Sequence, residues 1–417
     1  MKKESKVQNH KRRRIIILII VMALIGIIVG SVLIRNIVVN QETKRENYLA
    51  GENTSSSLMA SYIKKGVTIG GITGTLESLD TSDATATPED ILEGKTAYVN
   101  GVKITGTMKT GPGLEDITGS ETQNTETQDS LGNKVVIPAG FKVVNPQDNV
   151  EKGIIIEDVS AGDSNTKGSQ FVWVPVGKIK TSQGEKTITL GRYDFATDGT
   201  PSPYSGDYKE ETPSEHASSG YGNTVAKDIN AFKNSANANG GYYIGRYEAG
   251  DALATNTART DSTRDTNPIA CKTGVYPYNY VTQSQAASLC QNMYNNNNFT
   301  SDLINSYSWD TTIVFIQECS GDKDYSRQEK IQTTLTKCGE ATDGTNKDVR
   351  CNIYDMAGNC IEFSTETYYG SSGFPVVDRG AYYSPVNINK RVTSSRNCGF
   401  SLTSNYDSAT CRPIVYL

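Results

Sequence analysis

The sequence of 417 residues is poor in the residues on which many enzyme and metal sites depend. It contains only two histidines, His10 and His216, and no cysteine before Cys271. Histidine is the side chain that titrates near neutral pH and a common zinc ligand. The polar run 213–219 around His216 predicts an exposed loop, and neither a Walker loop nor a His-Glu-x-x-His motif is present. Ser-His-Asp hydrolysis, P-loop nucleotide chemistry and zincin-type proteolysis are therefore excluded.

Basic clusters are also missing beyond the first 45 residues. The formal net charge is −5. Residues 1–45 hold ten basic and two acidic side chains, which leaves a net charge of −13 on residues 46–417. An acidic surface repels the phosphate backbone of nucleic acids. Nucleic acid is therefore not expected as a partner.

The eight cysteines all lie beyond residue 270, and no two of them form a C-x-x-C pair: Cys271, Cys290, Cys319, Cys338, Cys351, Cys360, Cys398 and Cys411. This spacing, with so few histidines, argues against zinc. An even number of cysteines in an exported region is typical of disulfides, and buried free thiols are the alternative. We expect disulfides, with Cys398 and Cys411 among the bridged residues.

One long apolar run is present, from Ile15 to Ile34, with twenty residues and no charge. A helix of that length rises about 30 Å, which matches the hydrocarbon core of a bilayer. Basic residues dominate the flank before it, which favours a cytoplasmic N-terminus. A cleaved signal peptide, the alternative, has a shorter apolar region that ends in small residues. We expect a single-pass protein of the cell membrane, with a cytoplasmic basic tail (1–14), a transmembrane helix (15–36) and an extracellular remainder.

A short repeat follows a polar stalk, 37–57. Ile72-Thr-Gly-Thr-Leu76 recurs as Ile104-Thr-Gly-Thr-Met108. Asn100-Gly101 lies between two β-rich runs, and this dipeptide is a strong signal for a type I′ hairpin. We predict two small α+β repeat modules over 58–110, used as spacers. They resemble modules of phage tail and surface proteins of Firmicutes.

The rest of the chain predicts a linker followed by a larger domain. Residues 111–132 are rich in Gly, Thr, Ser and acidic residues and have few large apolar ones, which predicts a linker. Beyond it, short strand signals alternate with long polar loops. Two helices are predicted, one capped by Thr282 and one capped by Ser301. This pattern predicts an α+β domain over 133–417.

A series of motifs in this domain follows a fixed order: Phe171-Val-Trp-Val-Pro-Val-Gly177, Tyr243-Ile-Gly-Arg-Tyr-Glu-Ala249, Ser308-Trp309-Asp310, Tyr354-Asp-Met-Ala-Gly-Asn359, Arg379-Gly380, Ser394-Ser-Arg396 and Arg412-Pro413. The order resembles the formylglycine-generating enzyme (sulfatase-modifying factor) family, which implies a C-type-lectin-like fold. Enzymes of the family oxidise a sulfatase cysteine with two copper-binding cysteines placed shortly after the Arg-Gly pair. Residues 379–390 contain no cysteine. Because a thiolate copper site cannot be made there, we expect a non-catalytic member.

The same resemblance implies a structural calcium site at Asn359 and Glu362, whose oxygens are ligands that Ca²⁺ prefers. The alternative is a turn in which Asn359 adopts the left-handed conformation and Glu362 pairs with a neighbouring group. No other cofactor is expected.

Tyrosine, asparagine and serine are concentrated near the C-terminus, over 382–408. This composition resembles the variable region of lectin-fold proteins that are diversified by retroelements. Tyrosine beside small polar residues also suits a binding surface, because rigid rings lie next to adaptable hydrogen-bonding groups. A solvated loop is the alternative. On the binding interpretation we expect an exposed loop face that contacts the ligand through Tyr382, Tyr383, Asn387, Asn389, Asn397, Asn405 and Tyr406.

These features together predict a membrane-anchored extracellular display or adhesion protein that binds a protein or glycan. Two alternatives stay open. One is an oxidoreductase of the formylglycine-generating type with displaced cysteines. The other is a structural subunit of a pilus-like or prophage appendage.

Overall fold

The computed structural model describes residues 12–32, 35, 59–77, 81–107, 112–254, 256–261, 267–329, 332–340, 348–384 and 391–417. The predicted stalk, residues 1–11 of the predicted tail, and the predicted ligand-binding residues Asn387 and Asn389 lie outside the described residues. The chain divides into two compact units, Met1–Thr107 and Met108–Leu417.

The apolar run forms a helix from Arg12 to Val32, with a mean hydropathy of 3.2 and no part of it buried. It is long and apolar enough to cross a membrane, although a signal sequence near the N-terminus has the same properties. The helix is therefore confirmed, while its orientation across a membrane stays a prediction.

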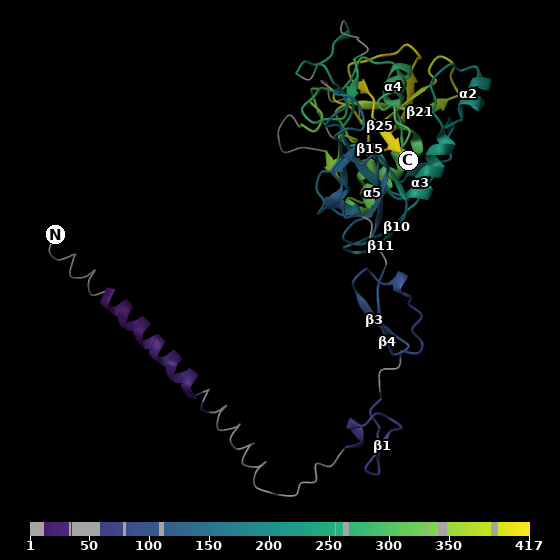
Figure 1. Cartoon of the computed structure of the whole chain (residues 1–417). Coiled ribbons are helices and arrows are strands. Elements are labelled where there is room, and N and C mark those ends of the chain that lie inside the picture. Colours follow the sequence, from purple (N-terminus) through teal and green to yellow (C-terminus); the bar gives the residue numbers. More distant parts are fainter. Residues whose placement is uncertain are drawn as a thin grey trace, which may run out of the picture. The chain divides into compact units, whose positions relative to one another are not determined.

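Each repeat forms a 3₁₀ turn followed by a two-stranded hairpin (Figure 1). The first comprises η1 (Ala60–Tyr62), β1 (Thr68–Ile69) and β2 (Ile72–Thr73), and the second η2 (Pro88–Asp90), β3 (Thr96–Val99) and β4 (Val102–Thr105). Asn100 and Gly101 have φ values of 50° and 74°. Both residues therefore adopt the positive φ that a type I′ turn needs, and the predicted hairpin is confirmed.

The glycine of the repeated Ile-Thr-Gly-Thr motif packs against backbone. A Cβ on Gly74 would lie 2.2 Å from the carbonyl oxygen of Ile63, and one on Gly106 would lie 2.1 Å from that of Ile91. The threonine after each glycine holds the hairpin to the 3₁₀ turn of its module. The Thr75 N–H donates to Ala60 O and the Thr107 N–H donates to Pro88 O, both at 2.7 Å. Only glycine lets the two backbone segments approach this closely, which explains why the Ile-Thr-Gly-Thr motif recurs.

The C-terminal unit is built on an antiparallel six-stranded sheet of order β18-β25-β15-β9-β8-β7. Its strands are β7 (Phe141–Val143), β8 (Ile155–Asp158), β9 (Gln170–Pro175), β15 (Gly241–Gly245), β18 (Thr300–Leu303) and β25 (Pro413–Tyr416). The last strand of the chain lies inside the sheet, between β15 and β18. Residues 409–417 are therefore fixed by the core of the unit.

A second sheet has five strands: β14 (Tyr208–Lys209), β21 (Ile361–Tyr368), β22 (Val376–Arg379), β23 (Arg396–Phe400) and β24 (Ala409–Thr410), which pairs in parallel with β21. The remaining described strands of this unit form five two-stranded sheets. They are β5 (Thr125–Gln128) with β6 (Lys134–Ile137), β10 (Gly177–Thr181) with β11 (Gly184–Ile188), β12 (Tyr193–Phe195) with β13 (Pro201–Pro203), β16 (Gly250–Asp251) with β17 (Ile269–Ala270), and β19 (Val349–Arg350) with β20 (Ile353–Tyr354).

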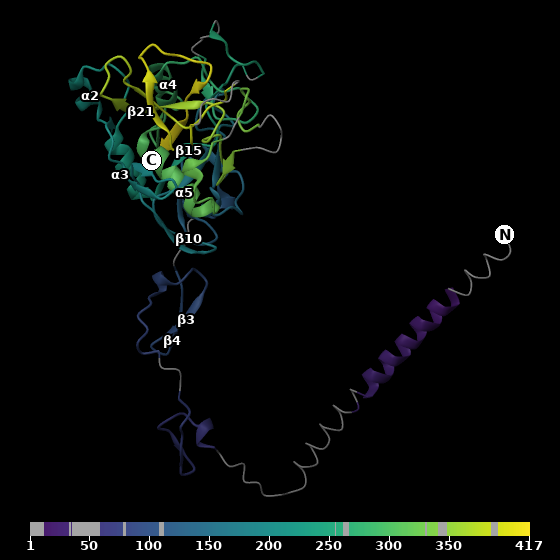
Figure 2. The same ribbon diagram turned by 180° about the vertical axis from the view of Figure 1, so that it is seen from behind.

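The helices of this unit are α2 (Pro213–Ser219), α3 (Ile229–Asn239), α4 (Gln283–Gln291) and α5 (Ser306–Ser320), with short 3₁₀ turns η3 (Leu114–Asp116), η4 (Val150–Lys152) and η6 (Tyr325–Arg327). Helix α3 packs on β15 and β25, and α5 packs on β9 and β21 (Figures 1 and 2). Short strands with a few helices confirm the predicted α+β class.

The N-cap prediction is right for one helix and wrong for the other. Thr282 caps α4 by accepting a hydrogen bond from the Gln285 N–H. The second helix starts later than predicted, because Asn305 caps α5. Ser301 instead lies in β18, opposite Val415. Both Ser and Asn are good N-caps, and the strand pairing decides between them.

The predicted linker over 111–132 is folded in its described part, from residue 112 onward. Leu114 and Ile117 are buried in the core, and β5 pairs with β6. His216 is another correction, since it lies buried in α2 and its Nε2 is 2.7 Å from Asn223 O. In the segment 213–219 the imidazole of His216 is buried, while Ala217 is exposed.

All eight cysteines lie within the described residues, and all are free. The expectation of disulfides is therefore wrong for this structure, and the alternative of free thiols holds. Five of the eight are buried, among them Cys290 in α4 and Cys411 before β25. A buried cysteine packs as a small apolar side chain. Burial also raises the pKa of the Cys319 thiol to about 12, which disfavours the reactive thiolate.

Candidate functional site

Tyr406 is the exposed member of those predicted binding residues that the structure describes, with half of its surface open to solvent. Its ring centroid lies 5.1 Å from that of Phe400, and Phe400 lies 5.3 Å from the buried ring of Phe363. These three rings connect the loop 401–408 to the core. An aromatic side chain held in this way loses little entropy when a ligand covers it.

The two tyrosines after Gly380 lie in a different environment. Tyr383 is 9% exposed, its N–H donates to Asn359 O at 2.8 Å, and its hydroxyl is hydrogen-bonded to Asp407. Tyr382 packs partly buried against the core, and the guanidinium of Arg391 lies 5.6 Å from its ring centroid. The expectation of an exposed ring is therefore wrong for Tyr383.

Asn397 and Asn405 are partly buried. Asn397 lies in β23 opposite Asp378, to which its side chain is hydrogen-bonded. Asn405 precedes Tyr406 in the loop 401–408. Of the described candidates, only Asn405 and Tyr406 therefore share one surface loop.

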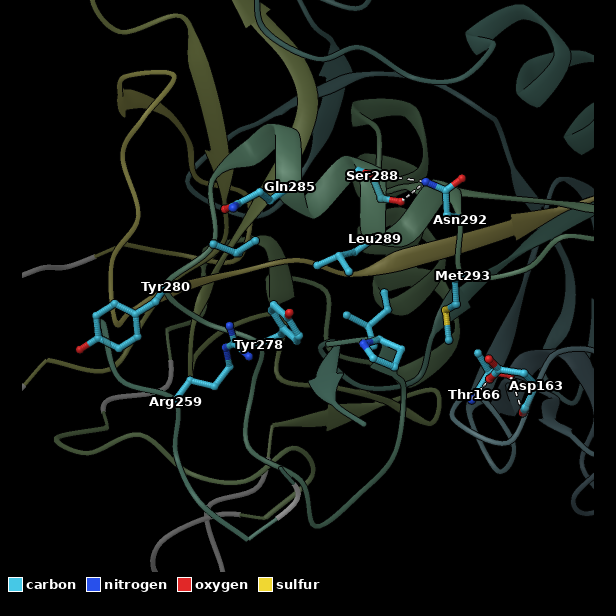
Figure 3. Close-up of a pocket in the computed structure, with 13 residues that line it drawn as sticks. Asp163, Thr166, Arg259, Tyr278, Tyr280, Gln285, Ser288, Leu289, Asn292 and Met293 are labelled. Atoms are coloured by element: carbon cyan, nitrogen blue, oxygen red, sulfur yellow. Dashed lines mark hydrogen bonds between the residues drawn. The ribbon is translucent and has the colours of Figure 1, made fainter. Parts of the chain in front are cut away.

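A cavity of about 380 Å³ has Tyr280, which is hydrogen-bonded to this loop, in its lining (Figure 3). The backbone joins Tyr280, in the lining of the cavity, to the loop, because the Tyr280 N–H donates a hydrogen bond to Tyr406 O at 2.9 Å. The Asn279 amide also donates to Asp407 O at 2.7 Å. Tyr280, at the rim of the cavity, has a φ of 53°, which is rare for a bulky residue. A residue of the cavity lining is therefore hydrogen-bonded to the loop, and the lining itself contains no residue of 401–408.

Side chains from distant segments line this cavity. Helix α4 and the residues after it contribute Gln285, Ser288, Leu289, Asn292 and Met293, while the other wall includes Tyr278, Ile269 and Arg259 (Figure 3). Asp163 and Thr166 lie at the far end. The lining is therefore an apolar centre with polar groups around it, as in most small-ligand sites.

The charges of this cavity are largely engaged by neighbours. The guanidinium of Arg259 lies 3.9 Å from the ring centroid of Tyr278 and forms a 2.5 Å ion pair with Asp251. The Asn165 N–H lowers the pKa of the Asp163 carboxyl, which is thus ionised at neutral pH. Burial raises the pKa of Tyr280, so its hydroxyl stays protonated. The lining contains neither histidine nor cysteine.

The predicted calcium ligands have protein partners. Asn359 has a φ of 61° and its Oδ1 accepts from the N–H and hydroxyl of Thr336, at 3.0 and 3.1 Å. Glu362 is buried and accepts from the Arg412 guanidinium at 2.5–3.0 Å. This geometry is that of the alternative, a left-handed Asn with a paired Glu. Within the described residues no group of three potential metal-ligating side chains is found. Calcium binding at this pair stays a prediction.

Glu248 is a partner of Asn359 that the sequence reasoning missed. Its carboxylate accepts from the Asn359 amide at 2.5 Å and from the Cys360 N–H at 2.8 Å. Burial, followed by the charges of Asp355 and Glu362, raises the pKa of Glu248 well above its usual range. The available signal was its place in the Tyr243–Ala249 motif, but the motif does not reveal its partner.

Comparisons with known proteins identify no family for this chain. No protein-family model matches the sequence, and no curated protein sequence matches it. Solved structures are similar to part of the chain, among them the following three. "CarF" is 12% identical with a TM-score of 0.31, over 58% of this chain and 97% of that one. "Treponema denticola variable protein 1" is 10% identical with a TM-score of 0.28, over 60% and 96%.

The third is PvdO from Pseudomonas aeruginosa, 13% identical with a TM-score of 0.29, over 61% of this chain and 96% of that one. TM-scores near 0.3 carry no argument about function. The class that the structure establishes is an α+β protein with an N-terminal apolar helix. The resemblance to the formylglycine-generating enzyme family depends on the sequence motifs.

Proposed function

We propose that this chain is a membrane-anchored extracellular protein that binds a protein or glycan through the loop 401–408 and the adjoining cavity. The observation that carries the proposal is the hydrogen bond from Tyr280 N to Tyr406 O. It joins the backbone of the loop that carries the exposed Tyr406 to Tyr280, which lines a cavity of about 380 Å³. Sites of that size hold small ligands or a single side chain of a larger partner.

Tyr406 is the expected energetic centre of this surface. Exposed tyrosines that become buried on binding commonly contribute about 2 kcal/mol or more to affinity. Leu289, on the wall formed by α4, provides apolar contact inside the cavity. The anchoring helix is Arg12–Val32, whose length and hydropathy suit a bilayer.

The test is a binding measurement with the labelled full-length chain in detergent micelles against a panel of bacterial cells and a glycan array. Tyr406→Ala should weaken binding to the target found for the unsubstituted chain by roughly 30-fold. Leu289→Trp, which fills the cavity, should weaken the same binding. Phe374→Ala is the matched control, since Phe374 is exposed to the same extent, 51% against 50%, at a different place. Equal losses of binding in Phe374→Ala and Tyr406→Ala would contradict the proposal.

The oxidoreductase alternative requires thiolate ligands for copper. Residues 379–390 contain no cysteine. Incubation of the purified chain with copper, oxygen and a cysteine-containing peptide should therefore convert no more of that peptide to formylglycine than a control without protein. Turnover would overturn the proposal of a non-catalytic protein.

A further inference from the structure

A second cleft in the C-terminal unit shares no residue with the cavity beside Tyr280. It has a volume of about 350 Å³, and more than half of its lining residues carry an aromatic ring or a guanidinium group: Tyr193, Phe195, Tyr204, Tyr208, Arg327 and Arg396. The four rings are all partly exposed. Partly exposed rings gathered in one cleft present flat apolar faces to a ligand.

One wall of this cleft is rigid. The ring of Tyr204 contacts two guanidiniums, with Arg396 at 3.9 Å and Arg192 at 4.6 Å from its centroid. Arg396 also donates to Asp310 Oδ2 at 2.6 Å and lies 2.7 Å from Glu366 Oε1. These contacts fix the ring before any ligand arrives, which lowers the entropic cost of binding.

The charge behind this wall is not negative, although the unit as a whole is acidic. Three guanidiniums, those of Arg192, Arg379 and Arg396, contact the two carboxylates of Asp310 and Glu366. A third carboxyl, Glu210, interacts electrostatically with Glu366 and Arg192. The carboxylate on the lining itself, Asp194, accepts from the Ser205 N–H at 3.1 Å. The guanidiniums therefore balance the carboxylates behind the wall, and Asp194 is the one carboxylate of the lining.

Arg327, at the end of η6, is the exposed cation of this cleft. Within the described part of the chain, no carboxylate lies within ion-pair distance of its guanidinium, whereas Arg192, Arg379 and Arg396 all have such partners. A guanidinium binds a carboxylate through two parallel hydrogen bonds. Ser394 adds a hydroxyl to the same lining.

We propose that this cleft binds a carboxylated sugar ring, a uronic-acid unit of an acidic polysaccharide. The carboxylate is held by Arg327, the apolar face of the ring lies on Phe195 and Tyr193, and Ser394 bonds a ring hydroxyl. An acidic peptide fits less well, because it would need several free cations along a groove and the cleft offers one. The site is separate from the surface at Tyr406 and goes beyond the function proposed above.

The test is isothermal titration calorimetry of the full-length chain in detergent micelles. The probes are the trimers of galacturonate, mannuronate and guluronate, with galactotriose and mannotriose as neutral counterparts. At least one uronate trimer should bind about ten times more tightly than its neutral counterpart, because a charge-assisted pair to Arg327 is added. Arg327→Ala should remove that preference, and Phe195→Leu should weaken the acidic and neutral sugars alike.

Lys323→Ala is the matched control, since it removes one exposed positive charge four residues before Arg327. Lys323→Ala should leave the preference for the uronate over the neutral trimer unchanged. Tyr406→Ala should also leave it unchanged, which distinguishes this site from the surface proposed above. The proposal is overturned if no uronate trimer binds, if Arg327→Ala and Lys323→Ala behave alike, or if a hexaglutamate peptide binds as tightly as the uronates.

Discussion

At the scale of single residues, Tyr383 and Tyr406 show how one residue type takes opposite roles in neighbouring segments. Tyr406 has half of its surface exposed, whereas Tyr383 is 9% exposed and is hydrogen-bonded to Asp407. The buried ring of Tyr383 contributes to stability, whereas the exposed ring of Tyr406 is available for the binding role proposed for it. Both roles can be separated by substitution.

We expect Tyr383→Ala to lower the free energy of unfolding by about 3 kcal/mol, because it removes a buried ring and leaves a cavity. Tyr406→Ala should lower it by less than about 1 kcal/mol, since that ring is half exposed. Urea denaturation of the full-length chain, followed by tryptophan fluorescence, measures both changes. Equal destabilisation by the two substitutions would contradict the assignment of Tyr406 to the surface.

Glu210 provides a prediction about pH. Burial, and then the charge of Glu366, raise the pKa of Glu210 from 4.5 to about 7. Between these values the folded state binds the proton more tightly than the unfolded state, so stability falls as pH rises. Asp302, Asp355 and Asp378 have raised pKa values and act in the same direction.

Glu210→Gln should therefore reduce the loss of stability between pH 5 and pH 8 by roughly 2 kcal/mol. A glutamine can still accept from the Ser306 N–H, which Glu210 does at 2.7 Å. Denaturation curves across this pH range measure the effect. Glu115→Gln, on an exposed residue, is the control and should leave the pH profile unchanged. An unchanged profile in Glu210→Gln would show that Glu210 is ionised throughout.

At the scale of elements, local signals predicted the structure wherever neighbouring residues decide it. Asn100-Gly101 formed the expected turn, and Thr282 capped the expected helix. Ser301 and Asn305 are both suitable caps, and the choice depends on pairing of Ser301 with Val415, more than 100 residues away. Helix α3 was missed because its buried residues, such as Phe232 and Ala236, are few among polar ones.

The repeat modules allow a prediction for one glycine. Gly106→Ala would place a Cβ 2.1 Å from Ile91 O, so the module must open. We expect faster proteolytic cleavage within residues 81–107 and an unchanged melting temperature of the unit 108–417, since the two units are separately compact. Limited proteolysis with mass spectrometry measures the first and calorimetry the second. Val102→Thr, on an exposed strand residue, is the control. Equal cleavage rates in both variants would show that the glycine is dispensable.

At the scale of the whole molecule, the candidate site could be predicted only in part. The sequence indicates Tyr406 through the concentration of Tyr, Asn and Ser around it. The cavity beside it joins Asp163, Arg259, Ile269, Tyr280 and Leu289, which are spread over more than 120 residues. No local pattern marks such a set, because its members meet only after the sheets have formed. The cysteine-free segment 379–390, in contrast, is visible in the sequence alone.

The last prediction concerns the membrane. The helix Arg12–Val32 carries three arginines at its start, and basic residues stay on the cytoplasmic side. Trypsin added to intact protoplasts that express the chain should therefore degrade the C-terminal unit and spare an N-terminal peptide that contains the helix. Lysed protoplasts serve as the control for protease access to both sides. Protection of the C-terminal unit in intact protoplasts would reverse the topology. A mature chain that begins beyond Val32, found by N-terminal sequencing, would identify the helix as a cleaved signal sequence, and the binding surface proposed at Tyr406 would then belong to a secreted protein.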